Sequence, residues 1–178
     1  MSEAAFFYGT LMSPEVRSRV LCGLYATQDS KKTKLATLRL RTAILKGHKR
    51  YALKERAYPG VIYTGNEEDQ VIGVLCEGLY SEDVKRLDAF EGDEYKRCTV
   101  EVTPVKSDGQ TTEAVVNTQV YIWIEGNDQL KSYDWEFDGF VKDRQEEWLQ
   151  DRDELKDVDA LDHMLATQQQ QQAEKVTS

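Results

Sequence analysis

The alternation of apolar and polar residues predicts short strands broken by two helices over the first two thirds of the chain. An apolar and aromatic run, Ala4 to Tyr8, ends at Gly9 and is typical of a buried strand. Proline at the first position of a helix predicts that a helix starts at Pro14, and it ends before Gly23. The residues of this helix expected to face inward are Val16, Val20 and Leu21.

Further strands follow this helix. Residues Lys34 to Leu53 suit strands interrupted around Gly47, and Gln70 to Tyr80 has the clearest strand pattern. A turn at Tyr58-Pro59-Gly60-Val61 leads into another apolar segment. Two later strands, Tyr95–Val105 and Glu113–Ile124, are joined through a Ser107-Asp108-Gly109 turn and form a predicted hairpin.

The second helix, Ser81 to Gly92, places a carboxylate among apolar side chains. Ser81 is the expected N-cap, and Gly92 is the stop. At about 100° per residue, Glu91 falls in one narrow stripe with Val84 and Leu87. An ionised carboxylate there costs several kcal/mol unless it is paired or needed for function. Glu91 is therefore either a working group, or a carboxylate that pairs with a buried arginine or rotates outward at the helix end.

In the C-terminal third of the chain, the spacing of apolar residues changes from that of strands to that of a helix. Apolar residues recur at helical spacing and predict an amphipathic helix packed across the sheet; they are Trp135, Phe140, Val141, Trp148 and Leu149. Both tryptophans are interpreted as packing residues. Beyond Asp151 the chain is acidic and then polar, with a run from Gln168 to Gln172, so we expect a fraying helix and disorder. This organisation gives one domain, residues 1–150, and an acidic extension, residues 151–178. Strands outnumber helices, which predicts an α+β fold with a mainly antiparallel, curved or closed sheet.

The composition narrows the class of protein. The formal charge of −9 disfavours nucleic-acid and anionic-membrane surfaces, and no apolar run is long enough for a membrane span or signal peptide. A cytoplasmic protein is expected. The three cysteines are isolated in the sequence, at Cys22, Cys76 and Cys98. Their odd number and wide spacing argue against a zinc site and against a framework of disulfide bonds. Cys76 is expected to be a buried thiol, and spacing alone leaves a Cys/His nucleophile pair open.

A second candidate element is the strand end Tyr8-Gly9-Thr10-Leu11. Glycine lets a ligand approach backbone N–H groups, which can hold a carboxylate or an oxyanion. The alternative is a plain strand-to-helix turn. Tyr121 either offers its phenol to a cavity or is a core residue, and Arg97 either orients a carboxylate or forms an ion pair on its strand face.

These residues occur in an order that resembles the γ-glutamylcyclotransferase-like family, in its avirulence-induced-gene-like branch. The resemblance covers roughly residues 5 to 150. The segments that carry it are Phe7-Tyr8-Gly9-Thr10-Leu11, Tyr58-Pro59-Gly60, Gly73-Val74-Leu75 to Leu79-Tyr80, Leu87-Asp88-Ala89-Phe90-Glu91-Gly92 with Tyr95 and Arg97, and Val120-Tyr121.

The resemblance implies a small mixed, mainly antiparallel β-barrel flanked by helices, with Glu91 as the catalytic acid/base. It implies a substrate site formed by Tyr8, Gly9, Thr10 and Leu11, to which we add Tyr121. The expected substrate is a small γ-glutamyl amine or peptide that is cyclised to 5-oxoproline without metal or cofactor. The leaving amine and the oligomeric state stay open. Alternatives are a ligand-binding accessory protein without turnover, and hydrolysis or transfer to another amine in the same cavity.

Overall fold

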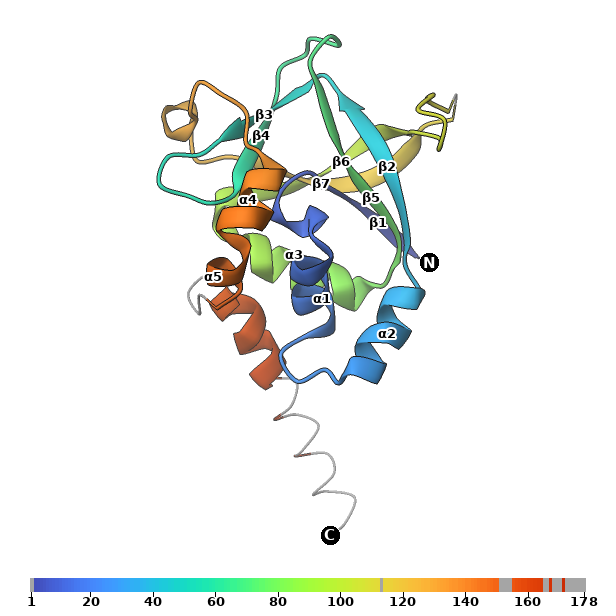
Figure 1. Ribbon diagram of the computed structural model, residues 1–178, viewed down its shortest axis with the longest axis vertical. Coiled ribbons are helices and arrows are strands. Elements are labelled where there is room, and N and C mark those ends of the chain that lie inside the picture. The colour runs from blue at the N-terminus through green and yellow to red at the C-terminus, as the bar shows by residue number, and fades with distance from the viewer. Residues whose placement is uncertain (1, 113, 151–154, 165–166, 168–170, 172–178) are drawn as a thin grey trace.

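Five strands close into a barrel in the computed structural model, which describes residues 2–112, 114–150, 155–164, 167 and 171 (Figure 1). Neighbouring strands are antiparallel, except that β1 and β7 run parallel where Ala5 pairs with Gln119. The predicted mixed, mainly antiparallel barrel is thus confirmed, and β6 and β7 form the predicted hairpin. In barrel order the strands are β1 (Glu3–Phe7), β5 (Gln70–Leu79), β2 (Arg39–Lys46), β6 (Tyr95–Pro104) and β7 (Val116–Trp123).

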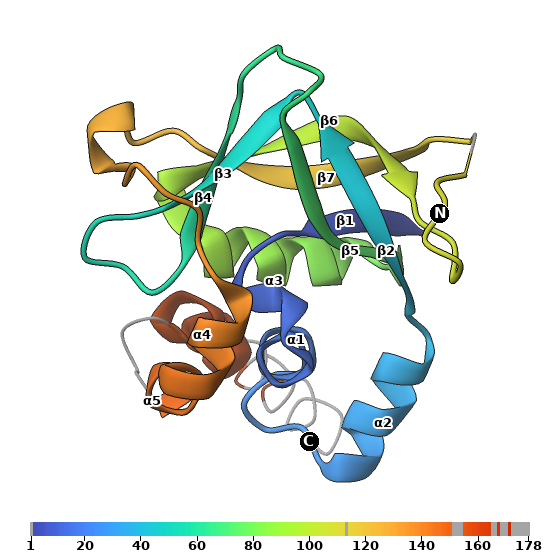
Figure 2. The same ribbon diagram turned by 45° about the horizontal axis from the view of Figure 1, so that its top comes forward.

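A separate two-stranded ribbon stands beside the barrel. It is formed by β3 (His48–Ala52) and β4 (Pro59–Tyr63), which pair antiparallel (Figure 2). Val61 of β4 is fully buried and belongs to the cluster that fills the barrel. The packing of β4 therefore holds its first residue, Pro59, and the preceding Tyr58 next to the end of the barrel.

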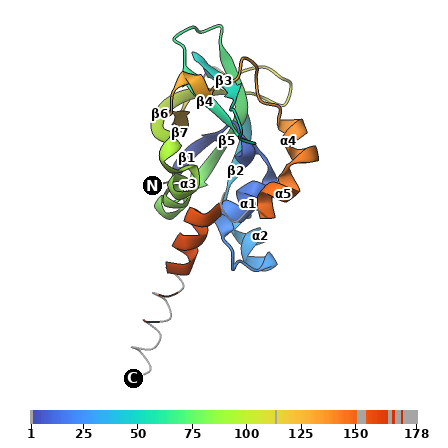
Figure 3. The same cartoon turned by 90° about the vertical axis from the view of Figure 1, so that its left-hand side faces the viewer.

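The helices gather on one side of the barrel, with α1 and α3 at the centre and α2 at the outer edge (Figures 1 and 3). No helix in the described part of the chain is both long and apolar enough to cross a membrane. The helices are α1 (Pro14–Cys22), α2 (Gln28–Ala36), α3 (Ser81–Glu91), α4 (Phe137–Asp143), α5 (Gln145–Gln150) and the helical segment 155–164, and the short 3-10 turns are η1 (Thr10–Met12), η2 (Gly92–Glu94) and η3 (Asn127–Gln129).

The core has two layers because successive strand residues point to opposite faces. On β1, Phe6 points into the barrel and Phe7 toward the helices, and on β5, Leu75 and Cys76 divide in the same way. Cys76 is the buried thiol that the sequence predicts. The helix-side layer is the larger one, and the site described below opens into it.

Three boundaries differ from the sequence-based predictions. Residues 34–36, expected in a strand, belong to α2, which buries no side chain and therefore shows no apolar period. The helix expected across residues 135–149 is two short helices, since the chain leaves helical geometry at Arg144. The predicted N-cap Ser81 is the first helical residue, because the Asp83 carboxylate accepts the N–H of Tyr80 at 2.8 Å and makes Tyr80 the cap.

Part of the acidic extension is docked on the helix layer. In segment 155–164, Leu155 and Val158 are fully buried, and Asp162 forms a buried ion pair with Arg86 of α3. This segment therefore packs as an element of the fold, where the composition had predicted fraying. The disorder expected from Gln168 to Gln172 concerns residues that, except for Gln171, lie outside the described part.

Candidate active site

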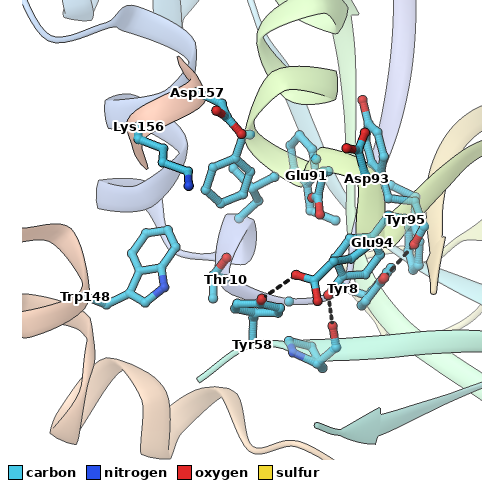
Figure 4. Close-up of a pocket in the computed structure, with 18 residues that line it drawn as sticks. Tyr8, Thr10, Tyr58, Glu91, Asp93, Glu94, Tyr95, Trp148, Lys156 and Asp157 are labelled. Carbon is cyan, nitrogen blue, oxygen red and sulfur yellow. Dashed lines mark hydrogen bonds between the residues drawn. The ribbon is translucent and has the colours of Figure 1, made fainter. Parts of the chain in front are cut away.

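A cavity of about 310 Å³ opens where the end of β1, the end of α3 and the C-terminal segment meet (Figure 4). Its wall is formed by residues near both ends of the described chain, by the end of α3, and by Pro59 at the start of β4 with the preceding Tyr58. The lining residues are Phe6 to Leu11, Tyr58, Pro59, Phe90 to Tyr95, Tyr121, Trp148, Lys156 and Asp157.

Glu91 is the last residue of α3, and its side chain enters this cavity. The helix ends because Gly92 adopts a positive φ of 69°, a conformation that favours glycine. In Figure 4 the Glu91 carboxylate points toward the floor of the cavity, where Tyr8 and Thr10 lie. Within the described residues it forms no ion pair or hydrogen bond, so neither a buried arginine nor an outward rotation explains it.

Burial changes the proton affinity of Glu91. Protein atoms replace most of the water around the carboxylate, which raises its pKa to about 8. The negative charge of Asp88 adds to this upward shift. Near neutral pH, the empty cavity therefore holds Glu91 mainly in its protonated form.

The glycine loop, residues 9–11, has backbone hydrogen-bond donors without acceptors in the cavity that Glu91 enters. Among the described residues, the backbone N–H groups of Gly9, Thr10 and Leu11 have no hydrogen-bond acceptor. The carbonyls are occupied, since Arg50 donates to Tyr8 O at 2.7 Å and Arg17 donates to Leu11 O at 3.1 Å. The loop thus lines the cavity with N–H groups that are free to bind a ligand, while these carbonyl groups are committed to the protein.

Glycine at position 9 is required by space. A Cβ there would lie 2.9 Å from Cδ of Pro59, closer than real Cβ contacts. Since Pro59 is the first residue of β4, this contact also fixes the loop against the start of that strand.

Buried tyrosines form the floor, and each hydroxyl is already committed. Tyr8 donates to Tyr121 O at 2.5 Å, and Tyr95 donates to Pro59 O at 2.6 Å. Burial is the main cause that raises the pKa of both phenols, so they stay neutral.

Tyr121 lines the cavity, and its hydroxyl donates a hydrogen bond to Asp88. The phenol donates to Asp88 Oδ1 at 2.8 Å, and burial followed by this hydrogen bond raises its pKa. Arg97 Nε lies 3.0 Å from the same oxygen. Of the alternatives left open, the structure therefore shows Arg97 in an ion pair with Asp88, not contacting Glu91.

Several lining residues carry no signal in the sequence. Trp148 was interpreted as packing, and it does pack edge-on against Phe90 and Phe140, yet it also lines the cavity. Lys156 and Asp157 lie in the acidic extension, which appeared to lack a core. By contrast, Trp135 is a packing residue, and its indole donates to Ala57 O at 2.7 Å.

Two other site classes find no support in the part of the chain that the structure describes. The cavity wall contains no cysteine or histidine, so a Cys/His nucleophile pair does not lie there. No group of three or more metal-ligating side chains occurs among residues 2–112, 114–150, 155–164, 167 and 171.

The fold agrees with comparisons to known proteins. AIG2-like protein A of Arabidopsis thaliana is 31% identical over 133 residues, which cover 75% of this chain and 68% of that one. A solution structure of another Arabidopsis thaliana protein superimposes with a TM-score of 0.55 at 26% identity, covering 84% of this chain and 87% of that one. A second solution structure from the same plant gives 0.57 at 23% identity, over 84% and 79% of the two chains, and shows the shared fold. The family model described as "Gamma-glutamyl cyclotransferase, AIG2-like" matches residues 5–137, and the chain belongs to that family.

Proposed function

We propose that this protein is a γ-glutamylcyclotransferase that converts a γ-glutamyl amide into 5-oxoproline and a free amine. Membership of the family supports the general reaction type. The observation that carries the proposal is the unpaired Glu91 carboxyl group facing the same cavity as the free N–H groups of residues 9–11. One group suits proton transfer, and the other suits a carboxylate or an oxyanion.

In the proposed complex, the N–H groups of Gly9, Thr10 and Leu11 hold the α-carboxylate of the substrate or the oxyanion formed from the amide carbonyl. The α-ammonium group lies beside Glu91. An adjacent positive charge favours the ionised carboxylate, so substrate binding converts Glu91 into the base. An α-ammonium group titrates near pH ~8, close to the pKa of about 8 that Glu91 has in the empty cavity, so the two groups are well matched for proton transfer.

The freed amine then attacks the side-chain carbonyl carbon of its own glutamyl group. A new C–N bond closes the five-membered lactam, and the original amide C–N bond breaks. Glu91 returns its proton to the departing amine. That amine also takes up the proton that the ring nitrogen loses as the lactam closes, so it leaves as an ammonium ion and no water is consumed. Because the nucleophile is tethered to its target, correct positioning supplies much of the acceleration.

Replacing the acid tests the assignment. Glu91→Gln keeps the shape of the side chain but removes the proton acceptor, and 5-oxoproline release should fall by at least about 100-fold, as for other general bases. Glu101→Gln, an exposed substitution on β6, serves as the matched control and should retain the parent rate. Mass analysis of products from a panel of γ-glutamyl compounds distinguishes cyclisation from hydrolysis, because 5-oxoproline is one water lighter than glutamate. Unchanged turnover by Glu91→Gln would contradict the mechanism.

A second candidate function is ligand binding without turnover. It is favoured by one observation, the raised pKa that keeps Glu91 protonated in the empty cavity at neutral pH. Calorimetry with γ-glutamyl compounds separates the two functions, since a binding protein gives heat of binding but releases no 5-oxoproline. The cytoplasmic location stays a prediction from the sequence.

A further inference from the structure

The cavity has a second group of side chains, which the C-terminal part of the chain contributes. Trp148, Lys156 and Asp157 come from α5 and segment 155–164, beyond the family match at residues 5–137. This wall of the cavity is therefore formed by the C-terminal part of the chain (Figure 4).

Trp148 brings an unused hydrogen-bond donor to this wall. The residue is only 6% exposed, and its indole Nε1 is buried without a partner in the described structure. Figure 4 shows this nitrogen on the side of the ring that faces Thr10. A buried donor without an acceptor costs about 1–3 kcal/mol, so a site that keeps one is suited to a ligand oxygen.

Lys156 is the one basic side chain among the described lining residues. It is exposed and has no carboxylate within ion-pair distance in the described residues, although acidic groups are abundant around the cavity. In Figure 4 its side chain extends toward Trp148. An unpaired ammonium group beside an unpaired N–H donor is the pattern that a carboxylate would complete.

We propose that Lys156 and Trp148 form a subsite for a carboxylate carried by the leaving amine. This inference rests on the proposed cyclotransferase function and names its preferred substrates: γ-glutamyl amino acids or peptides, in preference to γ-glutamyl alkylamines. The glutamyl half occupies the side with Glu91 and the glycine loop. The released half extends toward the C-terminal wall, where Lys156 supplies charge and Trp148 supplies a directed hydrogen bond.

Two substrates that differ only in the carboxylate test the subsite. γ-Glutamyl-alanine and γ-glutamyl-ethylamine share the same amide and the same two-carbon chain. For the full-length protein, kcat/KM should be higher for the alanine compound. Lys156→Met should lower the ratio of the two kcat/KM values by about fivefold, the upper range for an exposed ion pair, mainly through KM. Trp148→Phe keeps the aromatic packing, removes the N–H donor and should lower the same ratio.

Controls separate this inference from the proposed function. Lys142→Met changes an exposed lysine of α4 outside the cavity and should leave the ratio at the parent value. Equal turnover of both substrates, with a ratio unaffected by Lys156→Met and Trp148→Phe, would overturn the subsite and leave the cyclotransferase function standing. If neither substrate nor any other γ-glutamyl compound yields 5-oxoproline, the proposed function itself fails. In that case, calorimetric binding of γ-glutamyl-alanine that is weakened by Lys156→Met would still support a carboxylate site, and equal binding would exclude it.

Discussion

At the residue scale, the cavity makes ionisation of the Glu91 carboxyl group energetically costly, and the resulting rise in its pKa suits the group to proton transfer near neutral pH. This carboxyl group is partly buried in the cavity and lacks an ion pair among the described residues, so its ionisation is shifted toward neutral pH. The first consequence is kinetic. kcat/KM should rise about tenfold per pH unit below pH 8 as Glu91 of the free enzyme ionises, and should fall again above about pH 8 as the free substrate loses the α-ammonium proton that the mechanism uses. A pH–rate profile that is already flat from pH 6 would contradict this role.

The second consequence is for stability. The folded-state pKa of Glu91 lies above the usual 4.5, so the folded protein binds this proton more tightly than the unfolded chain does. The stabilisation is complete below about pH 4 and is lost as the pH rises through about 8. Glu91→Gln should therefore raise the free energy of unfolding relative to the parent by roughly 2–4 kcal/mol at pH 9 and change it little at pH 4. Urea denaturation at the two pH values measures the difference.

Asp88 should tune this proton affinity. Its charge is the second cause of the raised pKa of Glu91, after burial. Asp88→Asn keeps an oxygen that accepts the hydrogen bond from Tyr121 but removes the charge, so the pKa of Glu91 should fall. We expect the pH–rate profile to move to lower pH by less than about one unit, since burial remains. A move to higher pH would contradict this electrostatic account.

Single residues were predictable where they broke a local rule. Glu91 stood out because a carboxylate occupied an apolar stripe, and Gly9 because it ended a buried strand beside a helix start. Trp148 and Lys156 broke no such rule, since a tryptophan at helical spacing and a lysine among acids are ordinary. Their importance comes from the position of the C-terminal segment, which no local pattern specifies.

At the element scale, hydrophobic period predicted the strands and α3 well because their burial is regular. It missed α2, which has no buried face, and it joined α4 and α5 into one helix because their apolar residues keep helical spacing across Arg144. It also missed segment 155–164, whose two fully buried residues, Leu155 and Val158, are too few to mark a helix among so many charges.

Two ion pairs hold segment 155–164, and the buried pair between Asp162 and Arg86 should contribute more to its docking than the pair between Asp159 and Arg19. Asp162 and Arg86 are both buried, and Arg86 also donates to Val20 O at 2.8 Å. Asp162→Ala leaves the Arg86 charge buried without its partner and should cost about 3 kcal/mol of folding free energy. Asp159→Ala removes the partner of Arg19 on the same segment, where both side chains keep access to water, and should cost less than about 1 kcal/mol. Equal losses in chemical denaturation would contradict the ranking.

At the scale of the whole molecule, the site is built by both ends of the chain around one barrel. Residues 1–150 contain the barrel and Glu91 but lack Lys156, Asp157 and the buried residues of segment 155–164. A chain ending at residue 150 should therefore unfold at a lower temperature, by several degrees or more, because burying a Leu or Val side chain is worth about 1.5–3 kcal/mol. A chain ending at residue 167 keeps the segment and should melt close to the parent. Equal melting of the two truncated chains would show that the segment adds no stability.

The joint cavity wall also has a consequence for the order of events in synthesis and folding. Strand β1, at residues 3–7, leaves the ribosome about 150 residues ahead of Lys156 and Asp157. Contacts between such distant positions close late, because bringing them together costs the most chain entropy. In a nascent or partly folded chain, the cavity around Glu91 thus lacks its C-terminal wall until segment 155–164 docks. The proposed preference for a leaving amine with a carboxylate should therefore arise only when segment 155–164 docks, and its appearance during refolding would time the completion of folding.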